Sequence, residues 1–125
     1  IVMSEAPLPE EVRDLILRHI DSVAQLEALL FLRERSAEGW DAASIAKRLY
    51  APASEMVAAL AGLCNDGFLV RQGELYRYAP AAHGVAKVNA VAKAYARQLI
   101  PITDLIHSKP RNMKAFSDAF KFRKD

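Results

Sequence analysis

Side chains of the types that catalyse reactions or bind metals are few in this sequence, and they lie far apart. The chain of 125 residues has three histidines and a single cysteine, Cys64. No acidic residue or thiol accompanies His19, His83 or His107 at the spacing of a metal site on a helix. We find no glycine-rich phosphate loop, no nucleophile elbow and no paired carboxylates in an apolar setting. We therefore expect no enzymatic activity, no bound metal and no cofactor.

The single cysteine also bears on the compartment of the protein. One thiol cannot form a disulfide within the chain, which favours a reducing, cytoplasmic setting. No cation adjoins Cys64 in the sequence, so we interpret it as a small buried thiol rather than a redox sensor. No apolar run approaches the roughly 18–20 residues of a membrane span, and residues 1–4 do not resemble the start of a signal peptide. We expect a cytoplasmic protein without a membrane segment.

The charged side chains point to another kind of chemistry, which is contact with an anion. The net charge of +2, with 26% charged residues, is compatible with nucleic acid but too small to require it. Residues 51–70 contain no lysine or arginine, and cations lie on both sides of them. The four cations nearest to this segment are Lys47, Arg48, Arg71 and Arg77.

The elements that position these side chains change from helices to a short hairpin. Apolar residues at helical spacing predict four helices that end near residues 20, 36, 49 and 65. The second begins at Ser22, which has Gln25 at capping-box spacing, and the third begins at Asp41. Two β-like runs follow, over residues 68–71 and 74–78, and only two residues separate them. This spacing predicts a tight β-hairpin.

A helical extension makes up the last third of the chain. Residues 83–107 are predicted to be helical, with Pro101 kinking or splitting the helix. Seven side chains form a heptad seam along it: Val85, Val88, Ala92, Tyr95, Leu99, Ile102 and Ile106. Such a seam either joins two chains or packs back on its own domain. We expect a homodimer, because the seam is otherwise exposed. The predicted division is a domain over 1–80 and a dimerising extension over 81–125.

The order of helices followed by a hairpin is that of a winged helix-turn-helix. The segment from Trp40 to Pro80 resembles the winged-helix core of small bacterial transcriptional regulators of the MarR and ArsR kinds, and the resemblance covers about residues 10–80. It rests on Ile45-Ala46-x-x-Leu49, on Met56, Leu60 and Leu63, on Asp66-Gly67-Phe68-Leu69-Val70, and on Tyr76-Arg77-Tyr78. It implies a mainly α fold with a small β-hairpin, and the function of a DNA-binding regulator.

In that family the fourth helix enters the major groove of DNA and the hairpin, or wing, contacts the backbone or the minor groove. The resemblance therefore implies that the four flanking cations hold phosphates and that Ser54 lies near a base. These residues are Lys47, Arg48, Ser54, Arg71 and Arg77.

The fourth helix itself departs from the family pattern. With its larger apolar residues facing the core, its outer face is small and uncharged, and Glu55 adds a negative charge near its start. Such a face suits contact with another protein better than contact with a polyanion. A second hypothesis therefore stands beside DNA binding, namely a winged-helix module that binds a protein partner through Val57, Ala58 and Ala61.

Overall fold

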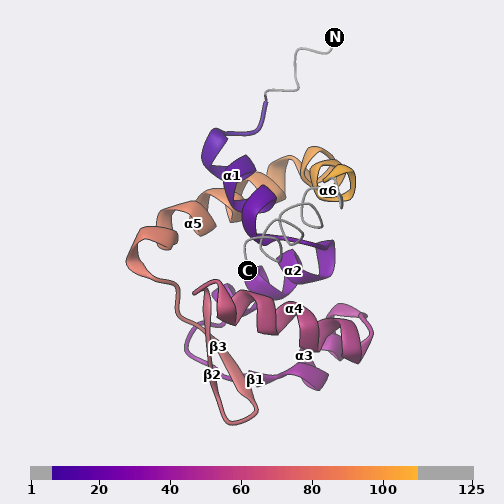
Figure 1. Cartoon of the computed structure of the whole chain (residues 1–125), viewed down its shortest axis with the longest axis vertical. Helices are drawn as coiled ribbons and strands as arrows, with labels where there is room; N and C mark the ends of the chain where they lie inside the picture. Colours follow the sequence, from indigo (N-terminus) through magenta and orange to yellow (C-terminus); the bar gives the residue numbers. More distant parts are fainter. Residues whose placement is uncertain (1–6, 110–125) are drawn as a thin grey trace, which may run out of the picture.

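The structure is a computed structural model that describes residues 7–109. This part of the chain is mainly helical, with six helices and a small three-stranded antiparallel sheet (Figure 1). None of its helices is long and apolar enough to cross a membrane. The helices are α1 (Glu10–His19), α2 (Val23–Glu34), α3 (Ala42–Leu49), α4 (Ala53–Asn65), α5 (Ala82–Arg97) and α6 (Leu99–Ser108), and the strands are β1 (Trp40–Asp41), β2 (Leu69–Gln72) and β3 (Leu75–Tyr78).

Helices α2 and α3 begin at the two capping residues that the sequence predicts. The Ser22 hydroxyl accepts a hydrogen bond of 3.0 Å from the backbone N–H of Gln25. The Asp41 carboxylate accepts hydrogen bonds from the hydroxyl and the backbone N–H of Ser44, at 2.7 and 3.1 Å. These bonds hold the pKa of Asp41 below its ordinary value, because they stabilise the ionised form. Both helix starts are therefore confirmed.

The sheet has one strand more than the predicted hairpin. Strand β1 pairs with β3, placing Trp40 opposite Tyr76, so that the strand order is β1-β3-β2. Strands β2 and β3 form the predicted hairpin, with Gly73 in its turn at φ 64°. A strand of two residues is too short to show the alternation by which strands are predicted from sequence. The expectation of a hairpin alone is therefore corrected to a three-stranded sheet.

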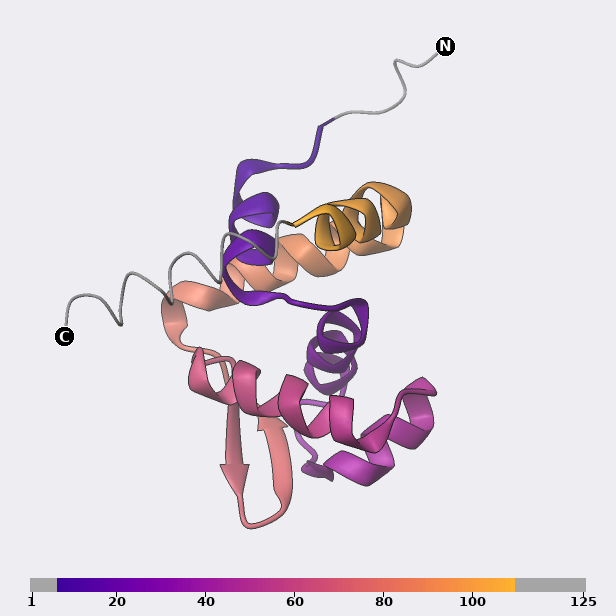
Figure 2. The ribbon, with the colours of Figure 1, turned by 45° about the vertical axis from the view of Figure 1, so that its right-hand side comes forward.

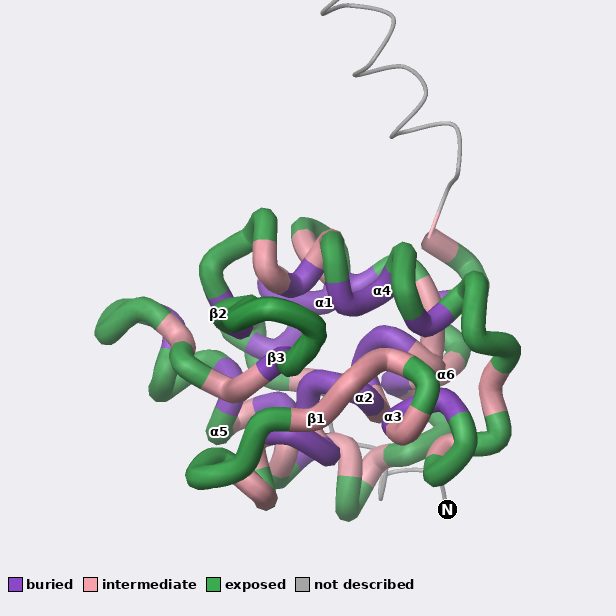
Figure 3. Tube along the Cα trace, turned by 90° about the horizontal axis from the view of Figure 1, so that it is seen from below, coloured by how far each residue is buried: buried purple, intermediate pink, exposed green. Residues whose placement is uncertain are grey.

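Helix α2 lies between two groups of elements (Figures 1 and 2). Helices α5 and α6 pack on α1 at one end of the molecule, and α3, α4 and the sheet lie at the other. The buried side chains of both groups belong to one core, and Figure 3 shows the buried residues in purple along the chain. Met56, Leu60 and Leu63 of α4 are fully buried, as predicted.

The predicted helical segment over residues 83–107 is split into two helices, which is one of the two outcomes expected of Pro101, but they meet at Gln98 and not at the proline. The break lies three residues before Pro101, which consequently falls in the first turn of α6. Proline is tolerated there because the first N–H groups of a helix have no partner within the helix. The chain turns at Gln98 and α6 packs on α1 and α5. The heptad seam is therefore not a continuous stripe.

Part of the seam lies in the core of the same chain. Val88 and Ile102 are fully buried and Ile106 is 4% exposed. Leu99 is 49% exposed, and Ala92 and Tyr95 are partly buried at the edge of α5. The expectation that these residues need a second chain to cover them is wrong for the buried three. Whether the protein dimerises stays a prediction.

One buried amide joins the start of α2 to α4. The side chain of Gln25 is 3% exposed, and its Oε1 accepts a 2.7 Å hydrogen bond from the backbone N–H of Asp21. Its Nε2 donates to the carbonyl oxygen of Ala59 in α4, at 3.0 Å. A Cβ atom at Gly62 would lie 2.9 Å from this Nε2, which is closer than real contacts allow. The absence of a side chain at Gly62 therefore makes room for the amide.

We expect the effect of Gly62→Ala on stability to change sign with the residue at position 25. In the natural protein it displaces a hydrogen-bonded amide and lowers the free energy of unfolding. With Gln25→Ala already present, which alone costs about 1–3 kcal/mol, it stabilises by up to about 1 kcal/mol through helix propensity. Urea unfolding of the four proteins measures this coupling.

The control for this comparison of four proteins is Gly84→Ala in α5. A Cβ atom there meets Phe68 at an ordinary 3.6 Å, so the substitution should have the same sign in both backgrounds. Equal effects of Gly62→Ala in the two backgrounds would contradict the assignment of the amide contact.

Candidate nucleic-acid interface

The outer face of α4 is the surface that the sequence predicts for DNA or a protein partner. Ser54, Val57, Ala58 and Ala61 are all exposed, and Val57 is exposed by half. The hairpin of β2 and β3 projects from the molecule near the C-terminal end of α4 (Figure 2). The helix and the hairpin therefore present adjoining exposed surfaces, of which the helical one is uncharged except at its start.

The two predicted arginines of the hairpin lie on its opposite faces. Arg71 is paired with Tyr76 and Arg77 with Val70, and neighbouring pairs in a ladder face opposite sides. Arg71 Nε donates to the carbonyl oxygen of Gly73 at 2.8 Å, and Arg77 Nη2 donates to Gln72 Oε1 at 2.9 Å. Both acceptors are neutral, so both arginines keep their net positive charge.

The two predicted cations of α3 differ in their surroundings. The guanidinium carbon of Arg48 lies 5.4 Å from the centre of the Trp40 ring and 5.7 Å from that of Phe31. These cation–π distances turn Arg48 toward α2 and β1 rather than toward the outer face of α4. Lys47 is exposed. The structure therefore does not gather all five predicted residues into one patch.

The charges of these four cations are nevertheless not neutralised within residues 7–109. The ion pairs in this part of the chain involve Arg18, His19, Arg35, Lys87 and Lys109. Asp14, for example, binds Lys87 and Arg18, and the hydrogen bond from Lys87 is the main reason why the pKa of Asp14 is lowered. Lys47, Arg48, Arg71 and Arg77 have no such carboxylate and remain available to an external anion.

Cys64 lies near the end of α4 and is partly buried, somewhat less than the sequence led us to expect. Burial raises the pKa of its thiol, and the positive charge of Arg71 opposes this shift. The thiol is therefore protonated at neutral pH, which gives no support to a redox sensor. Within the described residues no three His, Cys, Asp or Glu side chains lie close enough to hold a metal ion.

Comparison with known proteins gives no direct guide to the function. No protein-family model, curated protein or solved structure matches this chain.

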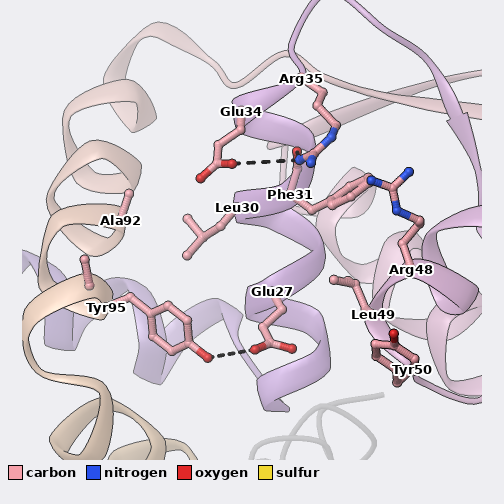
Figure 4. Close-up of a pocket in the computed structure, with 11 residues that line it drawn as sticks. Glu27, Leu30, Phe31, Glu34, Arg35, Arg48, Leu49, Tyr50, Ala92 and Tyr95 are labelled. Carbon is pink, nitrogen blue, oxygen red and sulfur yellow. Dashed lines mark hydrogen bonds and ion pairs between the residues drawn. The ribbon is translucent and has the colours of Figure 1, made fainter.

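A second surface, which the sequence did not reveal, is a groove of about 510 Å³. One stripe of α2, with Glu27, Leu30 and Glu34, forms its floor, and Figure 4 shows this floor between α5 on one side and α3 on the other. The α5 wall contains Ala92 and Tyr95, two residues that were predicted for a dimer interface. The remaining lining residues are Phe31, Arg35, Arg48, Leu49, Tyr50 and Ala96.

The floor and the α5 wall of this groove are joined by a hydrogen bond. The hydroxyl of Tyr95 donates to the carboxylate of Glu27 at 3.0 Å. Burial and this hydrogen bond raise the pKa of Tyr95 to about 12, so the hydroxyl remains a donor at any physiological pH. No signal in the sequence predicts this contact, because it joins residues 68 positions apart.

We expect the thiol of Cys64 to react slowly and to report the position of Arg71. Because burial raises its pKa, a disulfide reagent should react with it at a higher pH than with an unstructured cysteine. Arg71→Ala should move the pH profile higher still, because a nearby positive charge is lost. The rate of reaction against pH measures both effects, with Arg77→Ala as the control from the opposite face. A profile that shifts equally in the two variants would contradict the proximity of Arg71 to the thiol.

Proposed function

We propose that the protein is a winged-helix regulator that binds double-stranded DNA through the α4 face and the β2–β3 hairpin. The observation that carries this proposal is the set of four cations flanking α4 that no carboxylate in the described part of the chain neutralises. The order of elements supports it, because α3, a short turn at Ala51, α4 and a hairpin follow one another as in a helix-turn-helix with a wing.

The two faces of the hairpin suit contact with phosphates. A hairpin that lies along a groove of DNA has a sugar–phosphate strand on each side. Arg71 and Arg77 leave the hairpin from opposite faces, so that each can meet one strand. Both arginines now donate to neutral acceptors within the hairpin. A phosphate is charged and therefore a stronger acceptor, so it can replace these groups.

The α4 face contributes little to the free energy of DNA binding, apart from allowing the helix to approach the DNA closely. Its small side chains allow the helix to lie near the base edges, where Val57 and Ala58 can contact thymine methyl groups and Ser54 can donate one hydrogen bond. Most of the binding free energy then comes from a few phosphate contacts. We infer that affinity is modest and depends on salt.

We expect a shallow dependence of DNA affinity on salt. If each flanking cation neutralises one phosphate, the slope of log affinity against log salt is no steeper than about −4 per chain. Arg71→Ala and Arg77→Ala should each weaken binding to all sequences alike and reduce the slope by about 1. Fluorescence anisotropy with mixed-sequence duplexes over a range of salt measures this.

Lys93→Ala, which removes an exposed cation from α5, is the matched control and should leave DNA binding unchanged. The assignment is wrong if affinity survives the combined replacement of Lys47, Arg48, Arg71 and Arg77.

A protein-binding module is the second candidate, and the exposed apolar face of α4 favours it. Val57 is half exposed, and α4 carries no cation that could read a base or hold a phosphate. A partner protein that covered this face would remove apolar surface from water without having to compensate a charge.

Ala58→Arg separates the two candidates. On a DNA-binding face the new cation is tolerated or raises affinity without specificity. At an apolar protein interface it is buried without a partner, which costs several kcal/mol. The paired measurement is DNA affinity and recovery of a specific partner, for both proteins. Loss of a partner without any operator binding would favour the module, whereas binding to a defined operator with unchanged partners would favour the DNA regulator.

A further inference from the structure

The charges around the groove between α2, α3 and α5 are balanced, two of each sign. Glu27 and Glu34 are the acids, and Arg35 and Arg48 are the bases. Glu27 is already bound to the Tyr95 hydroxyl, and Glu34 lies 3.8 Å from Arg35. Arg48 forms no ion pair within residues 7–109. A nucleic acid or a small anion would bind best to a positively charged groove. A groove with an apolar centre and equal numbers of positive and negative charges is instead complementary to a surface with the same arrangement of charges, which a second copy of the chain has.

Glu34 and Arg48, whose charges have the weakest partners of the four around the groove, lie on opposite sides of it. Figure 4 shows Glu34 turned toward the α5 side of α2 and Arg48 rising from the α3 side. A two-fold rotation about an axis through the groove exchanges these positions. Glu34 of each copy then faces Arg48 of the other, and both charges gain a partner.

Tyr50 supplies a projecting side chain next to this hollow. It ends α3 in the left-handed conformation, at φ 57° and ψ 42°, which glycine or asparagine adopts more readily than tyrosine. The backbone N–H groups of Tyr50 and Ala51 bond the carbonyl oxygens that end α3, but Tyr50 is 96% exposed, so packing within residues 7–109 does not favour tyrosine over glycine or asparagine here. An exposed aromatic residue at the edge of an apolar groove, at a backbone position that suits glycine or asparagine better, points to contact with another molecule.

We propose that the groove is the interface between two copies of this chain, with Tyr50 of each copy seated in the groove of the other. One surface of the chain carries both the projecting Tyr50 side chain and the groove that would receive it. A two-fold rotation brings Glu34 of one copy opposite Arg48 of the other. This interface replaces the heptad seam of residues 83–107 as the predicted dimer contact, although it retains Ala92 and Tyr95. The proposal does not rest on the proposed function, because no residue that lines the groove belongs to α4 or the hairpin. The two proposals share Arg48, so Glu34→Arg and Tyr50→Asn are the variants that test the interface without removing a proposed phosphate contact.

Light scattering on a sizing column should give twice the chain mass of 13.8 kDa, and sedimentation should give its dissociation constant. Glu34→Arg and Arg48→Glu should each raise that constant by at least about 100-fold, because symmetry doubles each like-charge contact. The double variant should recover to within about tenfold of the natural protein.

Tyr50→Asn removes the projection but suits the left-handed conformation. It should raise the dissociation constant by at least about tenfold, while the unfolding stability of the dilute monomer is not reduced. Val57→Asn is the control, since it also replaces an exposed apolar residue but lies on α4, and it should leave the constant unchanged.

Three results would overturn the proposal. The first is a monomer mass for the natural protein at every concentration. The second is a dimer that tolerates both single charge reversals, or that the double variant does not restore. The third is a dimer that Val57→Asn disrupts and Tyr50→Asn does not. Each of these leaves the salt dependence of DNA binding to be judged separately.

Discussion

The buried amide of Gln25 is the contact on which the position of α4 depends. It is the one fully buried polar side chain in the described part of the chain, and it is bonded at both ends, to the start of α2 and to the carbonyl oxygen of Ala59. An amide held in this way fixes the distance and the register of two helices, because any slip leaves a buried polar group unsatisfied. The lack of a side chain at Gly62 is the matching half of the same constraint. The exposed α4 face is therefore presented in one orientation.

Helix α2 holds the other surface as well. Glu34 follows Gln25 by nine residues, which at about 100° per residue places the two on opposite sides of the helix. One side of α2 thus fixes α4 and the opposite side forms the floor of the groove. The two candidate surfaces share this rigid element and the side chain of Arg48, and their other residues differ. A substitution at any of those other residues can therefore be interpreted on one surface without changing the other.

The sequence predicts those features that depend on neighbours in the chain. Ser22 and Asp41 begin helices because their side chains bond N–H groups three residues on, and Met56, Leu60 and Leu63 are buried because their spacing puts them on one face. Strand β1 could not be predicted, since two residues carry no pattern. The break at Gln98 was misplaced because Pro101 is tolerated inside the first turn of α6. The groove could not be foreseen either, because the Tyr95–Glu27 contact and the exposure of Tyr50 arise from how distant helices pack.

The two proposals are compatible in geometry, although neither requires the other. In the proposed dimer, the second copy covers the groove, whose lining includes no residue of α4 or of the hairpin, so the α4 face and the hairpin are not part of that interface. Two copies of the proposed DNA-binding surface, related by a two-fold axis, would match a site whose half-sites are related in the same way. Each chain then needs few phosphate contacts, because the second half-site binds with a raised effective concentration once the first is bound. In that case a weak, uncharged contact between α4 and DNA would be sufficient for a dimer to bind, although a single chain would bind poorly.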